Sequence, residues 1–508
     1  MKKIAIINPL EKYFDRMSRL FIMPRYGTVA VGSALKRAGY EVRIFSEFIR
    51  AAIDWEYVYH SDYICFALMS FCSWRGYELA QQIRKKTKAP IIFGGAHPTV
   101  LPEECLNYCD YVVRNEGEET VVELIDSLEN GTDVHSIKGI SYRNASGRPV
   151  HNPNREFMEN IDIPYDLTLL NEYAEVGQRP YGKRPAVSLQ VLQTSRGCPF
   201  NCKFCVAPRE LGTRYRTKSI ATVLTDIENS MSVTKSNTFM IVDNEFTVNR
   251  KRTEKLLRAI IDRYGRTLNV ALFARTEIGK DKHTLDLMKQ AGVTLIYVGV
   301  ESVNEDTLKF YNKKQTIAEV TENIAGIHAS GIYTFGSTIL GSDYDTPEKI
   351  RNTADFFIQN NFLHANFYSL YEIPTKERVL GIPQLFPDNR FIHYDWRFYN
   401  SAFVIHYPKY MKPSTLQKII IENYEKFYSL KDKSRIDPLK GSLHGRVSFK
   451  LHMVKPEMEV ARRYIPFLEK LEDGLYDERE HLLESRLPSD FEKIEFYKEI
   501  PVDLSGLD

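Results

Sequence analysis

The sequence lacks an excess of charge of either sign, and it also lacks a long apolar run. Lys and Arg number 68 and Asp and Glu number 66, which leaves a net charge of +2 and argues against a nucleic-acid-coating surface or an acidic tail. No apolar run approaches the ~20 residues that span a bilayer, and the apolar stretch Ile4–Ile7 is too short for a secretory signal. We therefore expect a cytoplasmic protein with no transmembrane segment and no nucleic-acid partner.

Cysteine is scarce. The 508 residues contain 7 cysteines, at positions 65, 72, 105, 109, 198, 202 and 205. So few cysteines in a long chain argue against a disulfide framework and favour metal or redox chemistry. For the first four, burial as small apolar residues is the expected role.

The length of the chain predicts two or three domains, and residues 1–135 form the first. Short β-branched runs alternate there with helical patterns, which predicts a doubly wound, Rossmann-like α/β sheet; the runs are Lys3–Ile7, Glu41–Phe45, Tyr63–Leu68, Pro90–Phe93 and Tyr111–Val113. Ligands bind such sheets at the carboxyl ends of the strands. The polar and glycine residues that follow the strands are Asn8, Pro9, Ser70, Gly94, Gly95, His97, Glu116 and Gly117.

Residues 136–185 are expected to form a small hairpin and a linker, and residues 186–376 a second α/β domain. The six strands expected there are Ser188–Gln193, Thr238–Val242, Asn269–Phe273, Leu295–Val300, Tyr333–Ile339 and Asn366–Tyr371. The helices expected between them include Ile317–Ala329 and Pro347–Asn360. Six βα units are too few for a closed eight-fold barrel and predict an open, partial (β/α)6 barrel. Residues 377–508 follow as an aromatic-rich, helical C-terminal region with a charged tail.

Three cysteines, Cys198, Cys202 and Cys205, lie within eight residues after the first strand of the second domain. Thiolates hold iron–sulfur clusters, and three of them leave one iron of a [4Fe–4S] cube open to another ligand. A zinc site, or a cluster completed by Cys105 or Cys109, is the alternative, although no second C-x2-C knuckle of a zinc site is present.

The C-x3-C-x2-C spacing, with Phe204 just before the last cysteine, resembles the signature of the radical S-adenosylmethionine (SAM) enzymes. In that family the open iron binds SAM, and reduction cleaves SAM to methionine and a 5′-deoxyadenosyl radical. The resemblance also implies SAM contacts at later strand ends: Asp243, Asn244, Glu245, Arg275, Glu301, Ser302 and Gly336. Glu301 and Ser302 belong to a segment similar to the family's G-x-E-S, and Gly336 is expected to let the backbone approach adenine closely. The alternative for each of these is a helix cap or a surface turn.

The first domain resembles the cobalamin-binding domain of the B12-dependent members of this family. Gly94-Gly95-Ala96-His97-Pro98 is similar to their G-G-x-H-P segment, and Asn115-Glu116-Gly117-Glu118 to their G-E-G-E segment, with Asn115 in place of the first glycine. The chain has no D-x-H-x-x-G motif, so His97 is expected to be a hydrogen-bonding residue rather than the axial ligand of cobalt. One alternative is a flavodoxin-like domain that does not bind cobalamin. A dinucleotide-binding domain is less favoured, because no G-x-G-x-x-G motif occurs in this domain.

The resemblance implies a cobalamin-dependent radical SAM enzyme, similar to hopanoid methylases and Mg-protoporphyrin monomethyl ester cyclases. Its expected reaction is methylation of an unactivated carbon of a small molecule, with cobalamin passing on the methyl group of a second SAM. A radical rearrangement or oxidative cyclisation without methyl transfer is the alternative within enzymes, and a non-catalytic cobalamin or iron–sulfur sensor the alternative outside them. Most aromatic residues of the segment from Trp396 to Tyr410 are expected to lie in the core. The alternative is that some of them line an apolar pocket suited to a bulky hydrophobic substrate. A flavodoxin or ferredoxin is the expected electron donor.

Overall fold

The computed structural model describes residues 1–10, 21–49, 51–176, 180–181, 184–185, 187–373, 390–429 and 454–473. The chain divides into two compact units. The first contains Met1–Phe200 and Val206–Val270, and the second contains Asn201–Cys205, Ala271–Pro374 and the described part of Pro383–Asp508. Each unit is described by itself.

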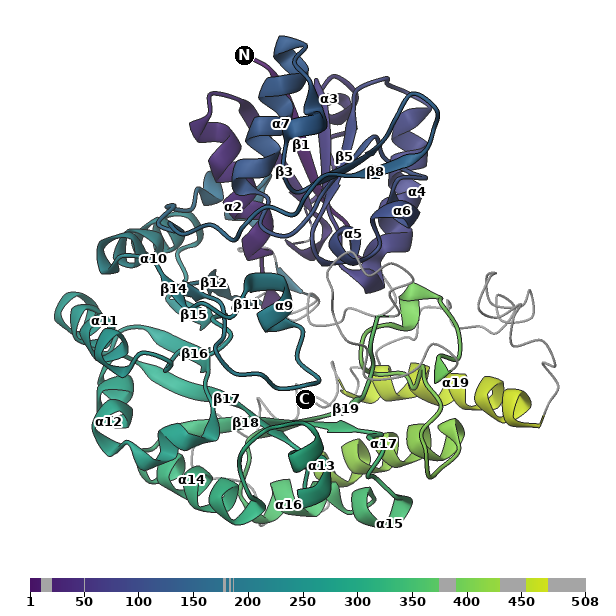
Figure 1. Ribbon diagram of the computed structural model, residues 1–508. Coiled ribbons are helices and arrows are strands. Elements are labelled where there is room, and N and C mark those ends of the chain that lie inside the picture. Colours follow the sequence, from purple (N-terminus) through teal and green to yellow (C-terminus); the bar gives the residue numbers. More distant parts are fainter. Residues whose placement is uncertain are drawn as a thin grey trace. The chain divides into compact units, whose positions relative to one another are not determined.

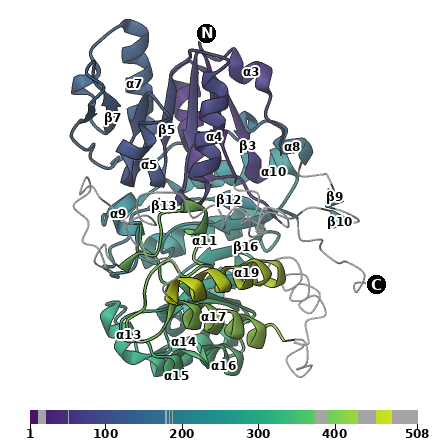
Figure 2. The same ribbon diagram turned by 90° about the vertical axis from the view of Figure 1, so that its right-hand side faces the viewer.

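The first unit begins with a seven-stranded sheet in the order β3-β1-β4-β5-β6-β7-β8 (Figures 1 and 2). The parallel strands are β1 (Lys3–Asn8), β3 (Glu41–Ser46), β4 (Tyr63–Ala67), β5 (Ile91–Gly94) and β6 (Tyr111–Val113). Successive strand residues face opposite sides of a sheet, so Ile4 and Ile6 join one core while Ala5 and Ile7 join the other. The predicted doubly wound domain is confirmed.

Helices cover both faces of this sheet. Helices α2 (Tyr26–Arg37) and α7 (Glu118–Asn130) pack in the core that contains Ile4, and α4 (Ser73–Arg84) packs in the core that contains Ile7. The predicted hairpin, β7 (Ile140–Arg143) and β8 (Pro149–His151), is not a separate element, because β7 pairs antiparallel with β6. The hairpin thereby covers a sheet edge that would otherwise expose unpaired backbone groups.

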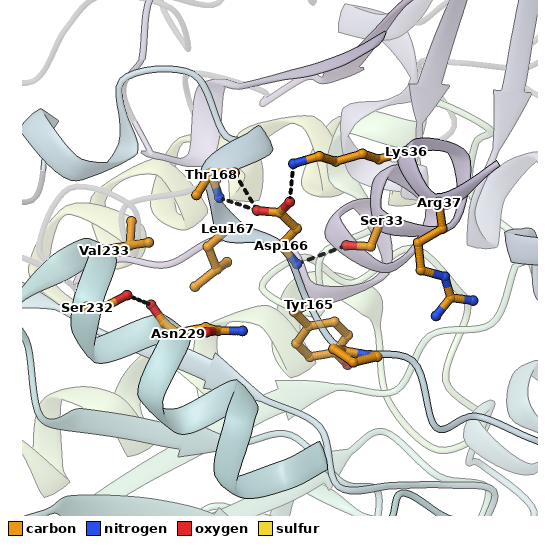
Figure 3. A pocket seen from close by; sticks show the side chains of 11 residues that line it. Ser33, Lys36, Arg37, Tyr165, Asp166, Leu167, Thr168, Asn229, Ser232 and Val233 are labelled. Atoms are coloured by element: carbon orange, nitrogen blue, oxygen red, sulfur yellow. Dashed lines mark hydrogen bonds and ion pairs between the residues drawn. The ribbon is translucent and has the colours of Figure 1, made fainter. Parts of the chain in front are cut away.

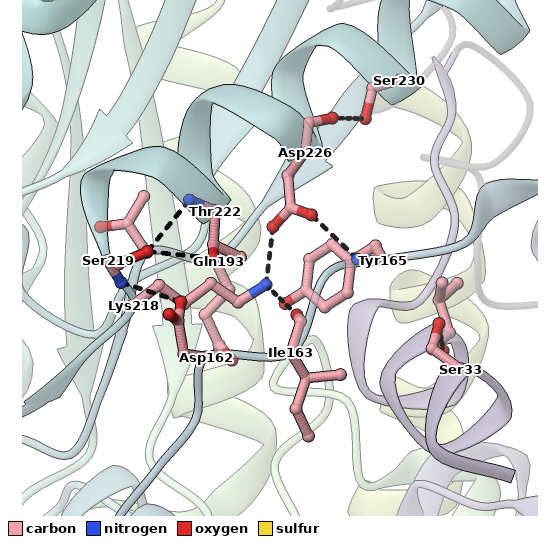
Figure 4. A network of polar contacts seen from close by, with 12 residues as sticks. Ser33, Asp162, Ile163, Tyr165, Gln193, Lys218, Ser219, Thr222, Asp226 and Ser230 are labelled. Carbon is pink, nitrogen blue, oxygen red and sulfur yellow. Dashed lines mark hydrogen bonds and ion pairs between the residues drawn. The ribbon is translucent and has the colours of Figure 1, made fainter. Parts of the chain in front are cut away.

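The predicted linker packs firmly against the rest of the first unit. Figure 4 shows Lys218, whose Nζ donates to the Ile163 carbonyl and to Asp226, both at 2.6 Å, while Asp226 accepts from the Tyr165 amide at 2.9 Å. Beside this segment lies an open pocket of 520 Å³ (Figure 3), in which Asp166 pairs with Lys36 at 2.5 Å. The buried pair of Lys218 and Asp226 thus holds the linker backbone at Ile163 and Tyr165.

Six strands form the second sheet, in the order β12-β15-β16-β17-β18-β19. They are β12 (Gln190–Leu192), β15 (Thr238–Ile241), β16 (Asn269–Phe273), β17 (Val293–Glu301), β18 (Tyr333–Leu340) and β19 (His364–Ser369). The helices that alternate with them are α10 (Ile220–Thr234), α11 (Arg250–Tyr264), α12 (Lys282–Gln290), α14 (Ile317–Ala329), α15 (Pro347–Ile350) and α16 (Thr353–Gln359). Strands in sequence order, joined by helices, confirm the predicted partial barrel.

The last of these helices was predicted as one, Pro347–Asn360, and it is broken into α15 and α16. Asn423 of α17 (Pro413–Phe427) reaches the break, where its side chain donates to the Ile350 carbonyl at 3.1 Å and accepts from the Ala354 amide at 2.7 Å. The side chain therefore satisfies the two backbone groups that the break leaves free.

The described C-terminal region is helical, as predicted. Helix α17 packs against α19 (Lys455–Glu472). The aromatic segment lies mostly in the core: Trp396, Phe398, Tyr399, Phe403 and His406 are all buried, and Tyr410 is exposed. The expected charged tail beyond residue 473 lies outside the described residues. No helix in the described part of the chain is long and apolar enough to cross a membrane.

Candidate functional site

A cavity of 440 Å³ opens at the carboxyl ends of β1, β4, β5 and β6 in the first unit. Five of the eight residues predicted there line it: Asn8, Gly94, Gly95, Glu116 and Gly117. The other three, Pro9, Ser70 and His97, are not among the lining residues. The remaining wall is largely apolar and includes Met23, Tyr26, Leu68, Met69 and Val113, which suits a large ligand with an apolar body.

Glycine is required at position 95 by close backbone approach. Gly95 has φ +105°, and a Cβ there would lie 2.6 Å from the Leu68 carbonyl oxygen and 3.0 Å from its nitrogen. Leu68 cannot move away easily, because its amide donates to the Gly94 carbonyl at 2.8 Å and its carbonyl accepts from the His97 amide at 3.2 Å. The glycine pair thus brings two strand ends together at the cavity wall.

Asn115 stands where the G-E-G-E pattern has its first glycine, and its backbone conformation shows why asparagine is tolerated there. Its φ is +61°, in the left-handed region that glycine adopts freely and that asparagine tolerates better than most residues. Its side-chain Oδ1 is buried and, within the described part of the chain, has no hydrogen-bond partner. Because Asn115 lines the cavity, this oxygen is an acceptor available to a ligand.

His97 is completely buried and hydrogen-bonds to other side chains. One ring nitrogen lies 2.7 Å from the Tyr77 hydroxyl and the other 3.2 Å from the Ser70 hydroxyl. These contacts place His97 and Ser70 behind the cavity wall, where they hold the glycine loop in place.

Glu210 is a cavity residue that the sequence interpretation missed. It lies on the short helix α9 (Ala207–Leu211) and lines the cavity. Burial raises the pKa of Glu210 to about 7, since an apolar environment disfavours the charged carboxylate. Nothing in the local pattern marks this residue, because only the fold brings α9 to the cavity.

Glu116 and Glu118 line the cavity, but their carboxylates pair with arginines. Both bind Arg196, and Glu116 also binds Arg216. Neither arginine was singled out from the sequence, because the pairing joins segments about 80 and 100 residues apart.

Cys198 lies in the first unit, directly after β13 (Ser195–Arg196). The loop before it is held by Asp243, which is completely buried and accepts three hydrogen bonds at 2.6 Å, from the Thr194 amide and hydroxyl and from the Ser195 hydroxyl. Burial raises the pKa of Asp243, although these hydrogen bonds oppose the shift. The structure therefore gives Asp243, predicted as a SAM contact, a role in supporting the cysteine loop.

Asn244 and Glu245 follow Asp243. The Asn244 Nδ2 is buried and has no hydrogen-bond partner among the described residues, which leaves a donor for a ligand. Glu245 is buried and accepts from the Thr247 amide at 2.8 Å.

Cys202 and Cys205 belong to the second unit and are partly exposed. The Cys205 amide donates to the Cys202 carbonyl at 3.1 Å, and the ring of Phe204 packs edge-on against Tyr311 with centroids 5.0 Å apart. None of the seven cysteines forms a disulfide bond. Within the described ranges, no group of three or more His, Cys, Asp or Glu side chains is arranged to hold a metal ion, so metal binding by the three cysteines stays a prediction.

The strand ends of the second unit bring Arg275, Glu301 and Ser302 into a polar network. The buried Glu301 has φ +68° and pairs with Lys313 Nζ at 2.9 Å, and Arg275 Nη2 donates to the Lys313 carbonyl at 3.0 Å. Ser302 is buried, and its Oγ accepts from the Asn304 amide at 3.0 Å. Lys313 was not predicted, although it holds the acidic residue of the G-x-E-S segment.

Gly336 has a packing role that differs from the expected contact with adenine. A Cβ at this position would overlap Phe357 of α16 and would lie 2.6 Å from Phe362. Glycine is thus needed where the strand meets the helix layer.

Two family models match separate parts of the chain. The model of the B12 binding domain matches residues 16–125, and the model of the radical SAM superfamily matches residues 192–357. The chain therefore combines a B12-binding domain with a radical SAM domain, as the sequence predicts.

Relatives with both kinds of chemistry are similar to this chain. An uncharacterized methyltransferase of Pyrococcus horikoshii is 29% identical over 66% of this chain and 72% of its own length. An anaerobic magnesium-protoporphyrin IX monomethyl ester cyclase of Rubrivivax gelatinosus is 27% identical over 72% of this chain and 67% of its own.

A solved structure has the same fold. The methyltransferase TsrM from Kitasatospora setae, solved with cobalamin and a [4Fe–4S] cluster, has a TM-score of 0.60 and 21% identity over 73% of this chain and 75% of its own. The predicted cofactors are SAM, cobalamin and a [4Fe–4S] cluster. The two matched families and this neighbour confirm the prediction.

Proposed function

We propose that this protein is a cobalamin-dependent radical SAM methyltransferase that acts on an unactivated carbon of a small molecule. The observation that carries the proposal is the cavity at the strand ends of the B12-binding domain. Its wall includes Gly94, Gly95 and Gly117, its lining is mostly apolar, and the Asn115 Oδ1 has no hydrogen-bond partner among the described residues. These features fit a corrin, whose apolar ring carries amide side chains.

The donor set fits the cluster. Cys198, Cys202 and Cys205 lie within eight residues and form no disulfide bond, and we propose them as the three ligands of a [4Fe–4S] cluster. When bound, the cluster supplies the electron that cleaves SAM, and cobalamin supplies a methyl group. The protein's contribution is to position these groups and to exclude water.

The chain's own residues act on the cofactors through position. Asp243 holds the loop that leads to Cys198, and Asn244 offers an unpaired donor suited to the carboxylate of SAM. Glu301, paired with Lys313, is suited to the ribose hydroxyls or the methionine ammonium. The expected electron donor, a flavodoxin or ferredoxin, also belongs to this proposal.

A second candidate is oxidative cyclisation, because the cyclase of Rubrivivax gelatinosus spans 72% of this chain. One experiment without the unknown substrate separates the two. Anaerobically reconstituted full-length protein is incubated with cobalamin, a low-potential reductant and SAM labelled with deuterium in its methyl group.

A methyltransferase is expected to place the label on the protein-bound cobalamin, as measured by absorbance and mass spectrometry. It is also expected to release 5′-deoxyadenosine in a slower, uncoupled reaction that Cys202→Ser abolishes. An enzyme that releases 5′-deoxyadenosine and never labels the cobalamin contradicts methyl transfer and favours cyclisation.

A further inference from the structure

Four charged side chains form a buried cluster in the first unit. Arg196, Arg216, Glu116 and Glu118 are each 4–7% exposed. Arg196 Nη1 lies 3.0 Å from Glu116 Oε1, and its Nη2 lies 2.5 Å from Glu118 Oε1. Charges so far from water persist only when they are paired and hydrogen-bonded, so each member of this cluster depends on the others.

Glu116 is the centre of the cluster. Besides Arg196, its carboxylate accepts from Arg216 Nη1 at 2.7 Å and from the Met158 amide at 2.7 Å. Strands β13 and β14 (Arg216–Thr217) pair antiparallel with Arg196 directly opposite Arg216. Two like charges opposite each other on neighbouring strands repel, and the carboxylate between them removes that repulsion.

The cluster connects two functional segments. Its acidic half belongs to Asn115–Glu118, all four residues of which line the cavity. Its basic half includes Arg196, which lines the cavity and stands two residues before Cys198. Arg196 is held a third time, because its Nε donates to Gln193 Oε1 at 2.8 Å. A shift of the acidic loop must therefore move Arg196, and with it the start of the cysteine loop.

We propose that Glu116 and Glu118 are positioning residues that make the cysteine loop sensitive to whether the cavity is filled. A ligand in the cavity restrains Asn115–Glu118, the two carboxylates then hold Arg196 in one place, and Cys198 is kept in the position that a cluster requires. The inference rests on the proposed function for the identity of the two ligands, cobalamin and an iron–sulfur cluster. In this arrangement the carboxylates of Glu116 and Glu118 bind arginines of the protein itself.

Iron release measures this connection without any turnover. Full-length protein with a reconstituted cluster is mixed with an iron chelator, with and without saturating hydroxocobalamin, and the half-time of iron loss is recorded. For the wild type, we expect cobalamin to lengthen the half-time about fivefold or more, the lower end of usual coupling between two sites.

Glu118→Gln tests the mechanism, because it keeps the side-chain shape and removes the charge that Arg196 faces. We expect this variant to bind cobalamin and to show a half-time that cobalamin changes by less than about twofold, since the coupling is lost. The matched control is Glu119→Gln at the next position of α7, where the carboxylate is exposed and lies 3.8 Å from Arg155; it should behave as the wild type. Arg196→Lys, which cannot hold both carboxylates, should repeat the result of Glu118→Gln.

Two outcomes overturn the inference. One is a wild type that binds cobalamin and loses iron at an unchanged rate, a result that needs no variant and leaves the proposed function intact. The other is a Glu118→Gln protein that loses iron faster by the same factor with and without cobalamin, as a purely structural role requires. A wild type that binds no cobalamin contradicts the proposed function itself.

Discussion

The two glycines at positions 95 and 39 allow the cavity geometry to be tested with a matched pair of substitutions. Both have φ near +100°, +105° for Gly95 and +96° for Gly39, so alanine at either position is strained. The strain costs about 1–2 kcal/mol at position 39. It costs about 1–3 kcal/mol at position 95, where ψ is −173° and essentially only glycine adopts this conformation. The two positions differ in their surroundings. A Cβ at position 39 meets nothing within 4 Å, whereas at position 95 it lies 2.6 Å from the Leu68 carbonyl oxygen.

Gly95→Ala should therefore lose more stability than the backbone strain alone explains. Leu68 is held through both its amide and its carbonyl, so relieving the overlap requires a backbone shift, which costs about 1–3 kcal/mol more. The expected loss of stability is about 2–6 kcal/mol for Gly95→Ala and about 1–2 kcal/mol for Gly39→Ala.

Denaturant unfolding of the two variants measures this difference, and titration with hydroxocobalamin measures its effect on the cavity. We expect Gly95→Ala to weaken cobalamin binding at least tenfold, about 1.4 kcal/mol, because its cavity wall moves. Gly39→Ala should bind as the wild type does. Equal losses of stability in the two variants, or unchanged binding in Gly95→Ala, would refute the close approach as the reason for glycine at position 95.

Three further predictions concern single contacts. Because burial raises the pKa of Glu210 to about 7 from its ordinary 4.5, the wild type should lose stability relative to Glu210→Gln as pH rises from about 4.5 to 7 and hold steady above that; thermal unfolding at a series of pH values checks this, and parallel curves contradict it. Gly336→Ala should cost about 1–3 kcal/mol through overlap with Phe357 and leave SAM affinity unchanged, as equilibrium dialysis can show; a selective loss of SAM binding would restore the expected adenine contact. Lys313→Met leaves the Glu301 carboxylate buried and unpaired and should cost about 3–5 kcal/mol in denaturant unfolding, part of which adding Glu301→Gln should recover; no recovery would argue against the ion pair.

Local patterns predicted the elements of the fold well. The alternation of apolar residues predicted β1, β3, β4, β5 and β6, and helix α14 has the predicted bounds, Ile317–Ala329. Such elements follow from side-chain periodicity over neighbouring residues. The helix predicted over Pro347–Asn360 is broken for a reason that no local pattern contains, since Asn423 comes from another helix.

In the candidate site too, local patterns predicted some features and only the fold decided others. The glycine loops could be found from the sequence because glycine at a strand end has a local conformational meaning. The role of Asp243 in holding Thr194, the packing of Gly336 and the presence of Glu210 in the cavity could not, because each depends on a neighbour distant in the chain.

By itself, the sequence determined the class of this protein: its cysteine spacing and glycine-containing segments resemble those of cobalamin-binding radical SAM enzymes, and the matching families bear this out. Only the tertiary structure decided what the charged residues near those motifs do. Glu116 is about 80 residues from Arg196, and whether its carboxylate faces a cofactor or an arginine depends on how the chain folds back. The spacing of residues along the chain specifies only local geometry. A buried charged side chain must be paired, and the fold decides which partner lies next to it.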